Sequence, residues 1–235
     1  MMLVLKIPLL GLDIACLLAA TETSPSPAPG YSRRRSERFL LAALPILDTI
    51  TIFAFTLETL IIILTSLRLR HLASFLMLRG TPESLHTNPH FFTGTMIMCM
   101  AAIMRYSCIQ CIRPFPSPNA NSNSSATPKT SDSTLVFRGP YKIVRHPLYS
   151  SRLIAELGLF LIFSAKGTWI AESGVLDTGL GQLGVVLWLV VCASKDTILL
   201  RRRIPREEGM LKRAFGKEWV EYRKKVMWKL VPGVY

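Results

Sequence analysis

Two short stretches of this 235-residue chain gather side chains that could do chemistry. The first, GPYKIVRHPLY at 139–149, combines an arginine and a histidine with two tyrosines. The second, RRRIPREE at 201–208, places three arginines before a pair of glutamates. The chain has only four histidines and contains no GxGxxG, phosphate-binding loop or GxSxG motif. We therefore look for its chemistry where these polar residues meet.

Arginine suits the binding of a carboxylate, because its planar fork can donate two parallel hydrogen bonds and stays charged at any working pH. Arg203 and Glu207 are four residues apart and would share one face of a helix. The spacing to the glutamates selects Arg203 over Arg201 and Arg202. The simpler alternative is a surface pair that contributes about 0.3 to 0.5 kcal/mol.

The first stretch also has simpler alternatives. Pro147 suits the first position of a helix, so His146 could serve only to cap that helix. Tyrosines are common at the depth of lipid headgroups, which would account for Tyr141 and Tyr149 without any ligand.

The elements that position these residues are expected to be membrane helices. Half of the chain is apolar and its mean hydropathy is +0.34, which is typical of a small polytopic membrane protein. No strand-like alternation of useful length appears, so we predict an all-α bundle of about five transmembrane helices. The five candidate spans are Leu3–Ala20, Phe39–Leu67, Phe91–Ile112, Leu153–Ile170 and Leu180–Leu200.

The first span is the weakest, because it contains Asp13 and could instead be a cleaved secretory signal. The predicted organisation is an N-terminal region of three spans at 1–113 with a Pro/Ser linker at 21–38. A polar, low-complexity loop follows at 114–133, with a glycosylation sequon at Asn123. A region at 134–235 then contains both motifs, a helical hairpin and interfacial helices.

The net charge of +13 concentrates in three regions that five spans would place on one side of the membrane. These regions lie at 33–38, at 129–145 and from Arg201 to Lys229, and the positive-inside rule makes their side cytoplasmic. The cations adjoin membrane spans, so we expect contact with anionic lipid and not with nucleic acid. The five cysteines lie in apolar runs without metal-ligand spacing, so no metal is expected.

In order, spacing and hydrophobic context, the two motifs resemble the C-terminal signature of the isoprenylcysteine carboxyl methyltransferase family. The resemblance covers Leu135 to Tyr235, and MCMAAIMRYSC resembles the arginine-bearing helix of that family. It implies an enzyme of the endoplasmic reticulum membrane with a cytoplasmic C-terminus. This enzyme would use S-adenosyl-L-methionine to methylate the C-terminal carboxylate of prenylated cysteine, during CaaX processing of its protein partners.

The resemblance also implies roles for individual residues. Cofactor-binding residues would be Thr134, Leu135, Val136, Tyr141, His146, Pro147, Leu148, Tyr149 and Glu207. Arg203 would face the substrate carboxylate. For Arg105, a charge inside a span costs at least about 2.5 to 3.5 kcal/mol, which makes a role near that carboxylate a reasonable hypothesis. Asp48 and Glu58 in the second span are expected to face the bundle interior.

Methyl transfer from a sulfonium to a carboxylate cancels opposite charges, so excluding water helps and no strong general base is needed. One departure from the family pattern is Ser151, which stands where the family usually has glycine. If close approach of backbone to cofactor needs glycine there, affinity falls. Two alternatives stay open: a phospholipid N-methyltransferase, which would require a more acidic acceptor site, and a catalytically inactive relative.

Overall fold

The computed structural model describes residues 3–21, 35–112 and 135–234, and every regular element in these ranges is helical. This confirms the predicted all-α fold. The longer helices are α1 (Lys6–Thr21), α2 (Arg35–Ser66), α4 (Pro89–Ile112), α5 (Pro147–Ser164), α7 (Gly179–Ile198), α8 (Ile204–Phe215) and α9 (Lys217–Lys225). Short helices and turns are α3 (Arg70–Phe75), η1 (Pro82–Ser84), η2 (Gly139–Lys142), α6 (Trp169–Glu172), η3 (Val175–Asp177) and η4 (Leu199–Arg203).

Four helical stretches in the described ranges are long and apolar enough to cross a membrane, so the protein is a multi-pass membrane protein. They are Pro45–Ser66, Pro89–Ile112, Pro147–Glu172 and Gly179–Phe215. The sequence predicts about five spans, and the first of them, Leu3–Ala20, is not among these four. The first predicted span does form a helix, but α1 has 16 residues and measures about 24 Å at 1.5 Å per residue. That is shorter than the roughly 30 Å of a typical hydrocarbon core.

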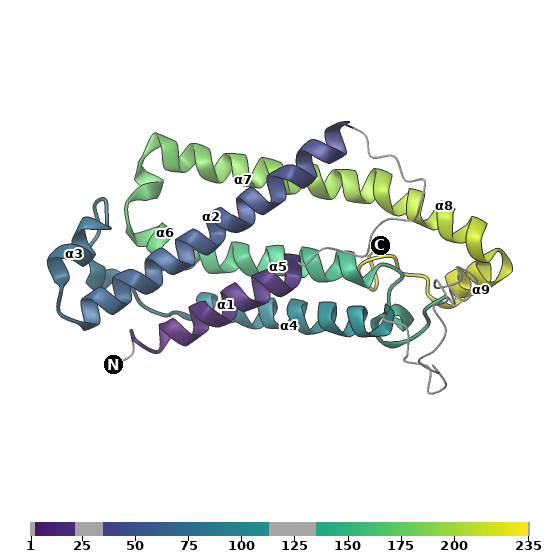
Figure 1. The fold of residues 1–235 in the computed structure, drawn as a ribbon, viewed down its shortest axis with the longest axis horizontal. Helices are drawn as coiled ribbons and strands as arrows, with labels where there is room; N and C mark the ends of the chain where they lie inside the picture. Colours follow the sequence, from purple (N-terminus) through teal and green to yellow (C-terminus); the bar gives the residue numbers. More distant parts are fainter. Residues whose placement is uncertain (1–2, 22–34, 113–134, 235) are drawn as a thin grey trace, which may run out of the picture.

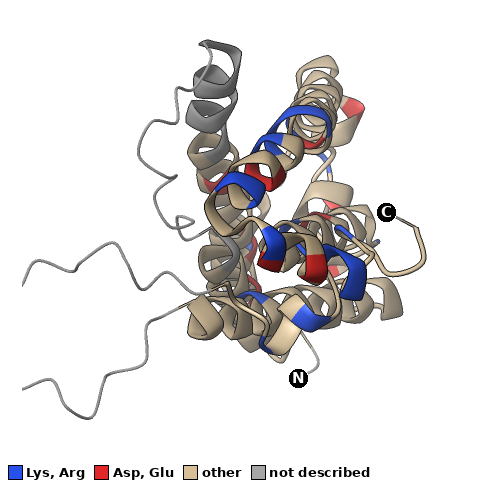
Figure 2. Ribbon diagram, turned by 90° about the vertical axis from the view of Figure 1, so that its right-hand side faces the viewer, with Lys and Arg blue, Asp and Glu red and all other residues tan. Residues whose placement is uncertain are grey.

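The helices alternate in direction along the bundle (Figure 1). The C-terminal end of α4, the N-terminal end of α5 and the pair α8 and α9 lie toward one end, here named the α8–α9 end. Short helices α3 and α6 lie at the opposite α3–α6 end. Lysine and arginine residues are frequent in the chain at the α8–α9 end, which faces the viewer in Figure 2. Of the three predicted basic regions, residues 138–145 and 201–229 lie together at this end. The region at 33–38 and residues 129–134 stay a prediction.

The closest helix packing is between α4 and α5, where two glycines face each other. A Cβ atom on Gly94 would lie 2.9 Å from the carbonyl oxygen of Gly158, and a Cβ on Gly158 would lie 3.0 Å from the carbonyl oxygen of Gly94. Small residues allow helix backbones to approach in this way in membranes. The pair therefore sets the distance between α4 and α5, and α5 carries the first motif at its N-terminus.

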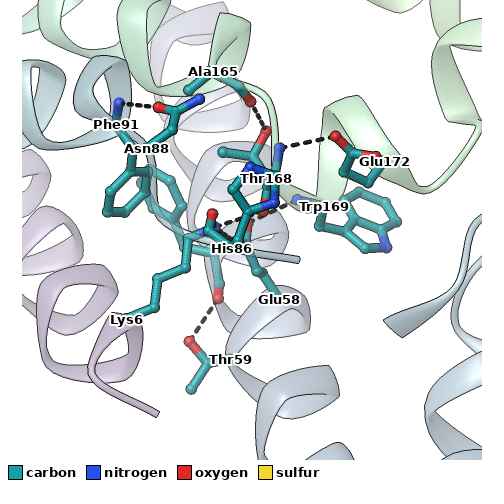
Figure 3. A network of polar contacts seen from close by, with 12 residues as sticks. Lys6, Glu58, Thr59, His86, Asn88, Phe91, Ala165, Thr168, Trp169 and Glu172 are labelled. Carbon is teal, nitrogen blue, oxygen red and sulfur yellow. Dashed lines mark hydrogen bonds and ion pairs between the residues drawn. The ribbon is translucent and has the colours of Figure 1, made fainter. Parts of the chain in front are cut away.

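A buried ion pair at the α3–α6 end fixes α1 to the rest of the bundle (Figure 3). Lys6 is fully buried, and its Nζ lies 2.5 Å from Oε1 of Glu58. The same ammonium donates to the carbonyl oxygens of Gly167 at 2.8 Å and His86 at 3.1 Å. The other carboxylate oxygen of Glu58 accepts from the backbone N–H of Trp169 at 3.0 Å. The prediction that Glu58 faces the interior is confirmed.

Asp13, the acidic residue within the first predicted span, is also buried. Its Oδ2 accepts a hydrogen bond of 3.1 Å from the hydroxyl of Thr95 on α4. Leu10 and Leu17 of the same helix belong to the main hydrophobic core. This packing favours the interpretation of α1 as part of the bundle over the alternative of a cleaved signal.

Candidate functional site

The first motif leads into α5 at the α8–α9 end. Pro147 stands in the first turn of the helix, as expected, and His146 occupies the preceding N-cap position. The side chain of His146 makes no capping hydrogen bond, so the capping interpretation does not explain it. The backbone N–H groups of Arg145 and His146 donate to the carbonyl oxygens of Trp228 and Lys229, both at 2.9 Å. The C-terminal segment therefore holds the motif backbone in place.

The second motif lies on a continuous helix that changes its winding. A single π turn, labelled η4, separates α7 from α8 and ends at Arg203. Pro205 follows and cannot donate the hydrogen bond that an α-helix would send back to the carbonyl of Arg201. The wider turn before it follows from this missing donor. Single π turns inside α-helices often occur at functional sites, because they redirect the side chains around them.

The structure brings the two motifs together around the carboxylate of Glu207. The hydroxyl of Tyr149 on α5 donates a hydrogen bond to Oε1 of Glu207 on α8. The Nε atom of Arg203 lies 3.4 Å from the same oxygen, and its guanidinium carbon lies 5.3 Å from the centroid of the Tyr149 ring. Nδ1 of His146 lies 3.7 Å from Oε2 of Glu207. Residues more than fifty positions apart thus form one cluster.

A second carboxylate in this cluster was missed by the sequence reasoning. Oε1 of Glu208 lies 2.8 Å from Nη1 of Arg145 and 3.6 Å from Nε2 of His146. Both partners of the ion pair are largely buried, with 4% of the Arg145 side chain and 15% of the Glu208 side chain exposed. The sequence did contain a signal for this ion pair. Arg145 directly precedes His146 and Glu208 directly follows Glu207, so both residues lie within the two motifs.

A third set of contacts holds the segment that precedes the first motif. The hydroxyl of Tyr222 on α9 donates to the carbonyl oxygen of Tyr141 at 2.8 Å. Burial raises the pKa of Tyr222 to about 12 and also raises the pKa of Tyr141, so both phenols stay protonated at neutral pH. Leu135 packs against the cluster of Trp219, Tyr222 and Val226. Helix α9 therefore packs on this segment.

The other predicted site residues differ in how far they are buried, and one of them lies outside the described residues. Pro147 is buried, whereas Val136 and Leu148 are partly exposed. Arg105 is buried on α4, and only 4% of its surface is exposed. Helix α4 packs near its end against η2, where the left-handed Gly139 (φ 55°) leaves no room for a Cβ beside Sγ of Cys111. Thr134 lies outside the described residues, as does the sequon at Asn123.

Ser151, the departure from the family pattern, is fully buried inside α5. Its hydroxyl donates to the carbonyl oxygen of Leu148 at 2.9 Å, so its polar group is satisfied within the helix. In the described part of the chain no group of three or more His, Cys, Asp and Glu residues is arranged to hold a metal ion.

Together, the fold and the cluster define a class: helical multi-pass membrane proteins with a charged site at one end of the bundle. Part of the chain is similar in sequence to an isoprenylcysteine methyltransferase, which confirms the resemblance predicted from the motifs. Protein-S-isoprenylcysteine O-methyltransferase B of Arabidopsis thaliana is 34% identical over 92 residues, or 39% of this chain.

A Delta(14)-sterol reductase of Methylotuvimicrobium alcaliphilum is 46% identical over 39 residues, or 17% of this chain. The matched regions span 36% of the length of the methyltransferase and 9% of the length of the reductase. No family model matches the chain. No solved structure matches it either.

Proposed function

We propose that this protein is an S-adenosylmethionine-dependent methyltransferase that esterifies the C-terminal carboxylate of prenylated cysteine. The observation that carries the proposal is the cluster in which Tyr149, Arg203 and Glu207 meet, because it unites both motifs of the resemblance in one site. The match to the Arabidopsis methyltransferase supports the same assignment.

The residues present fit such a cofactor, which carries a sulfonium and an ammonium group. Two carboxylates, Glu207 and Glu208, lie within 4 Å of the imidazole of His146 and provide negative charge for a cationic ligand. Nε2 of His146 is buried and makes no hydrogen bond to the described residues, so it has capacity for one from a ligand. The ring centroids of His146 and Tyr149 lie 5.9 Å apart with their planes inclined by 24°, so two aromatic rings lie beside the carboxylates.

The cofactor, when bound, supplies a methyl group made electrophilic by its sulfonium. Arg203 positions the acceptor by holding its carboxylate, and Glu207 and Tyr149 hold Arg203 in turn. The acceptor carboxylate is already ionised at neutral pH, so the protein needs no general base. Its contribution is alignment and the exclusion of water, and alignment can supply as much as about 7 to 11 kcal/mol in the best intramolecular cases.

We further propose that the enzyme lies in the endoplasmic reticulum membrane, with the α8–α9 end and its site on the cytoplasmic side. The basic residues gathered at that end support this orientation, because positively charged segments are retained in the cytoplasm. Prenylated protein C-termini would reach the site from the surrounding bilayer.

The test is a transfer assay with membranes that contain the protein and radiolabelled S-adenosylmethionine. A farnesylated cysteine analogue and phosphatidylethanolamine are offered in parallel as acceptors, and label is expected in the prenylcysteine ester alone. Label in the phospholipid would favour the N-methyltransferase alternative, and label in neither would favour an inactive relative.

Two further measurements sharpen this test. Arg203→Ala should reduce transfer at least tenfold, whereas Arg202→Ala, which alters an exposed neighbour, should leave it unchanged. Reduction of a sterol double bond would need a hydride donor, so binding of NADPH in place of S-adenosylmethionine would point to the activity of the reductase relative. Full activity of the Arg203→Ala variant would remove the proposed substrate anchor.

A further inference from the structure

Charged side chains outside the candidate site meet within the membrane-spanning part of α5 and α7. Lys195 of α7 forms a close ion pair with Oε1 of Glu156 on α5. Arg152 contacts the same oxygen at 3.4 Å, and Lys195 also lies 3.1 Å from Oδ1 of Asp196. The four side chains are between 11% and 26% exposed. Asp48 of α2 interacts electrostatically with both Arg152 and Lys195.

These charges are costly where they lie. A single charged side chain near the middle of a transmembrane helix costs about 2.5 to 3.5 kcal/mol on insertion scales. Buried ion pairs are weak contributors to stability, and their best-attested use is to select one register or arrangement of packed elements. We therefore expect this ion pair to select one arrangement of α5 and α7, the helices that carry it.

The pair is close to the candidate site along both helices. On α5, Tyr149, Arg152 and Glu156 are spaced by three and four residues and so share one helix face. On the other helix, Lys195 precedes the π turn that ends at Arg203. One ion pair thus connects the two helices that present Tyr149 and Arg203.

Helix α7 has little other packing to fix its rotation. Only 6% of the most apolar stretch in Gly179–Phe215 is buried, and many of its leucine and valine side chains are exposed. Helix α7 also contacts α2, and Trp188 packs edge-on against Phe163 of α5, but few buried side chains oppose a rotation of α7 about its own axis. Because η4 continues α7 without a break, a rotation of α7 would carry Arg203 with it.

We propose that Glu156 and Lys195 are positioning residues that fix the rotation of α7 against α5, so that Arg203 faces Tyr149 and the acceptor carboxylate. This inference rests on the proposed function for its effect on catalysis. Neither residue touches the reacting groups. Their loss should therefore impair use of the acceptor more than binding of the cofactor. Glu207 follows Arg203 on the same helix, but the other cofactor-binding residues, among them His146 and Tyr149, lie at the start of α5.

The test compares neutral variants with conservative ones. In Glu156→Gln and Lys195→Met, kcat/KM for the farnesylated acceptor should fall about tenfold, while the Kd for S-adenosylmethionine should rise by a clearly smaller factor. Glu156→Asp and Lys195→Arg keep the charges and should recover most of the activity. Thr197→Val is the matched control, because this exposed α7 hydroxyl bonds only to the carbonyl of Ala193 among the described contacts.

A second readout does not depend on activity. Phenylglyoxal modifies accessible arginines, and mass spectrometry can compare Arg203, which is partly buried, with exposed Arg201 and Arg202. In the wild type Arg203 should react more slowly than its neighbours, and in Glu156→Gln it should react as fast as they do.

The outcomes separate the two proposals. An unchanged labelling pattern in Glu156→Gln would overturn the positioning role, as would a parallel loss of cofactor binding, which would indicate general damage to the fold. No recovery in Glu156→Asp and Lys195→Arg would also contradict it. A wild type that transfers no label to any acceptor would instead contradict the proposed function, and the labelling experiment would still test the rotation of α7.

Discussion

The hydrogen bond between Tyr149 and Glu207 allows a sharp test of the candidate site, because Tyr149→Phe removes one hydroxyl and keeps the ring. We expect this variant to bind S-adenosylmethionine about tenfold more weakly than the wild type. The expected cause is loss of orientation in the Glu207 carboxylate, which would then spend less time directed toward the cofactor.

The magnitude follows from the chemistry and exposure of the pair. A hydrogen bond to a charged group contributes about 1.5 to 3 kcal/mol. The Glu207 side chain is 28% exposed, so water can partly replace the lost donor and the lower end of that range applies. About 1.4 kcal/mol corresponds to a factor of ten in Kd.

The assay is isothermal titration of S-adenosylmethionine into purified protein for Tyr149→Phe, Glu207→Gln and the double variant. If Tyr149 acts through Glu207, its substitution should change Kd less than twofold once Glu207 is already glutamine. Tyr106→Phe, at an exposed tyrosine of α4, is the matched control and should bind like the wild type. Two results would refute the reasoning: the same tenfold loss in both backgrounds, or no loss in either.

Three other predictions concern the fold that supports the site. Gly158→Val should lower the melting temperature, because a Cβ there would lie 2.8 Å from Cγ of Met98, and overpacking of this kind costs about 1 to 3 kcal/mol. Thermal unfolding in detergent measures this change. An unchanged melting temperature would show that α4 and α5 can separate freely. Lys6→Met should destabilise the protein by about 3 to 5 kcal/mol, because it leaves the carboxylate of Glu58 buried without its cation. In the same measurement, the double variant Lys6→Met, Glu58→Leu should recover most of this lost stability. The free energy of unfolding should fall as the pH rises from about 10 to 12, since the folded state raises the pKa of Tyr222 to about 12 and so favours the protonated phenol. If a Tyr222→Phe variant loses the same stability over this pH range, another group causes the loss.

The long helices could be predicted from sequence because hydrocarbon thickness fixes the length of an apolar run. The number of spans could not, since Leu3–Ala20 has the composition of a span, but its helix begins only at Lys6 and is too short. Asp13 was the visible warning. Composition does not reveal that Lys6 and Asp13 find buried partners elsewhere in the bundle.

At the site, the resemblance predicted that two distant motifs would meet, and the structure places Tyr149 beside Glu207 and Arg203. It could not predict the backbone bonds from Arg145 and His146 to the C-terminal segment, because carbonyl groups leave no signature in a sequence. The ion pair of Lys195 and Glu156 was detectable only as isolated charges in two apolar runs.

The polar contacts of α1 also have a consequence for biogenesis. Its ammonium at Lys6 needs Glu58 on α2 and the backbone of Gly167, which precedes α6, and Asp13 needs Thr95 on α4. These partners are synthesised after α1 has already left the ribosome. The polar contacts of α1 are therefore completed only after α2, α4 and α5 have been made, and until residue 167 has emerged its charges must stay hydrated or be shielded by the insertion machinery.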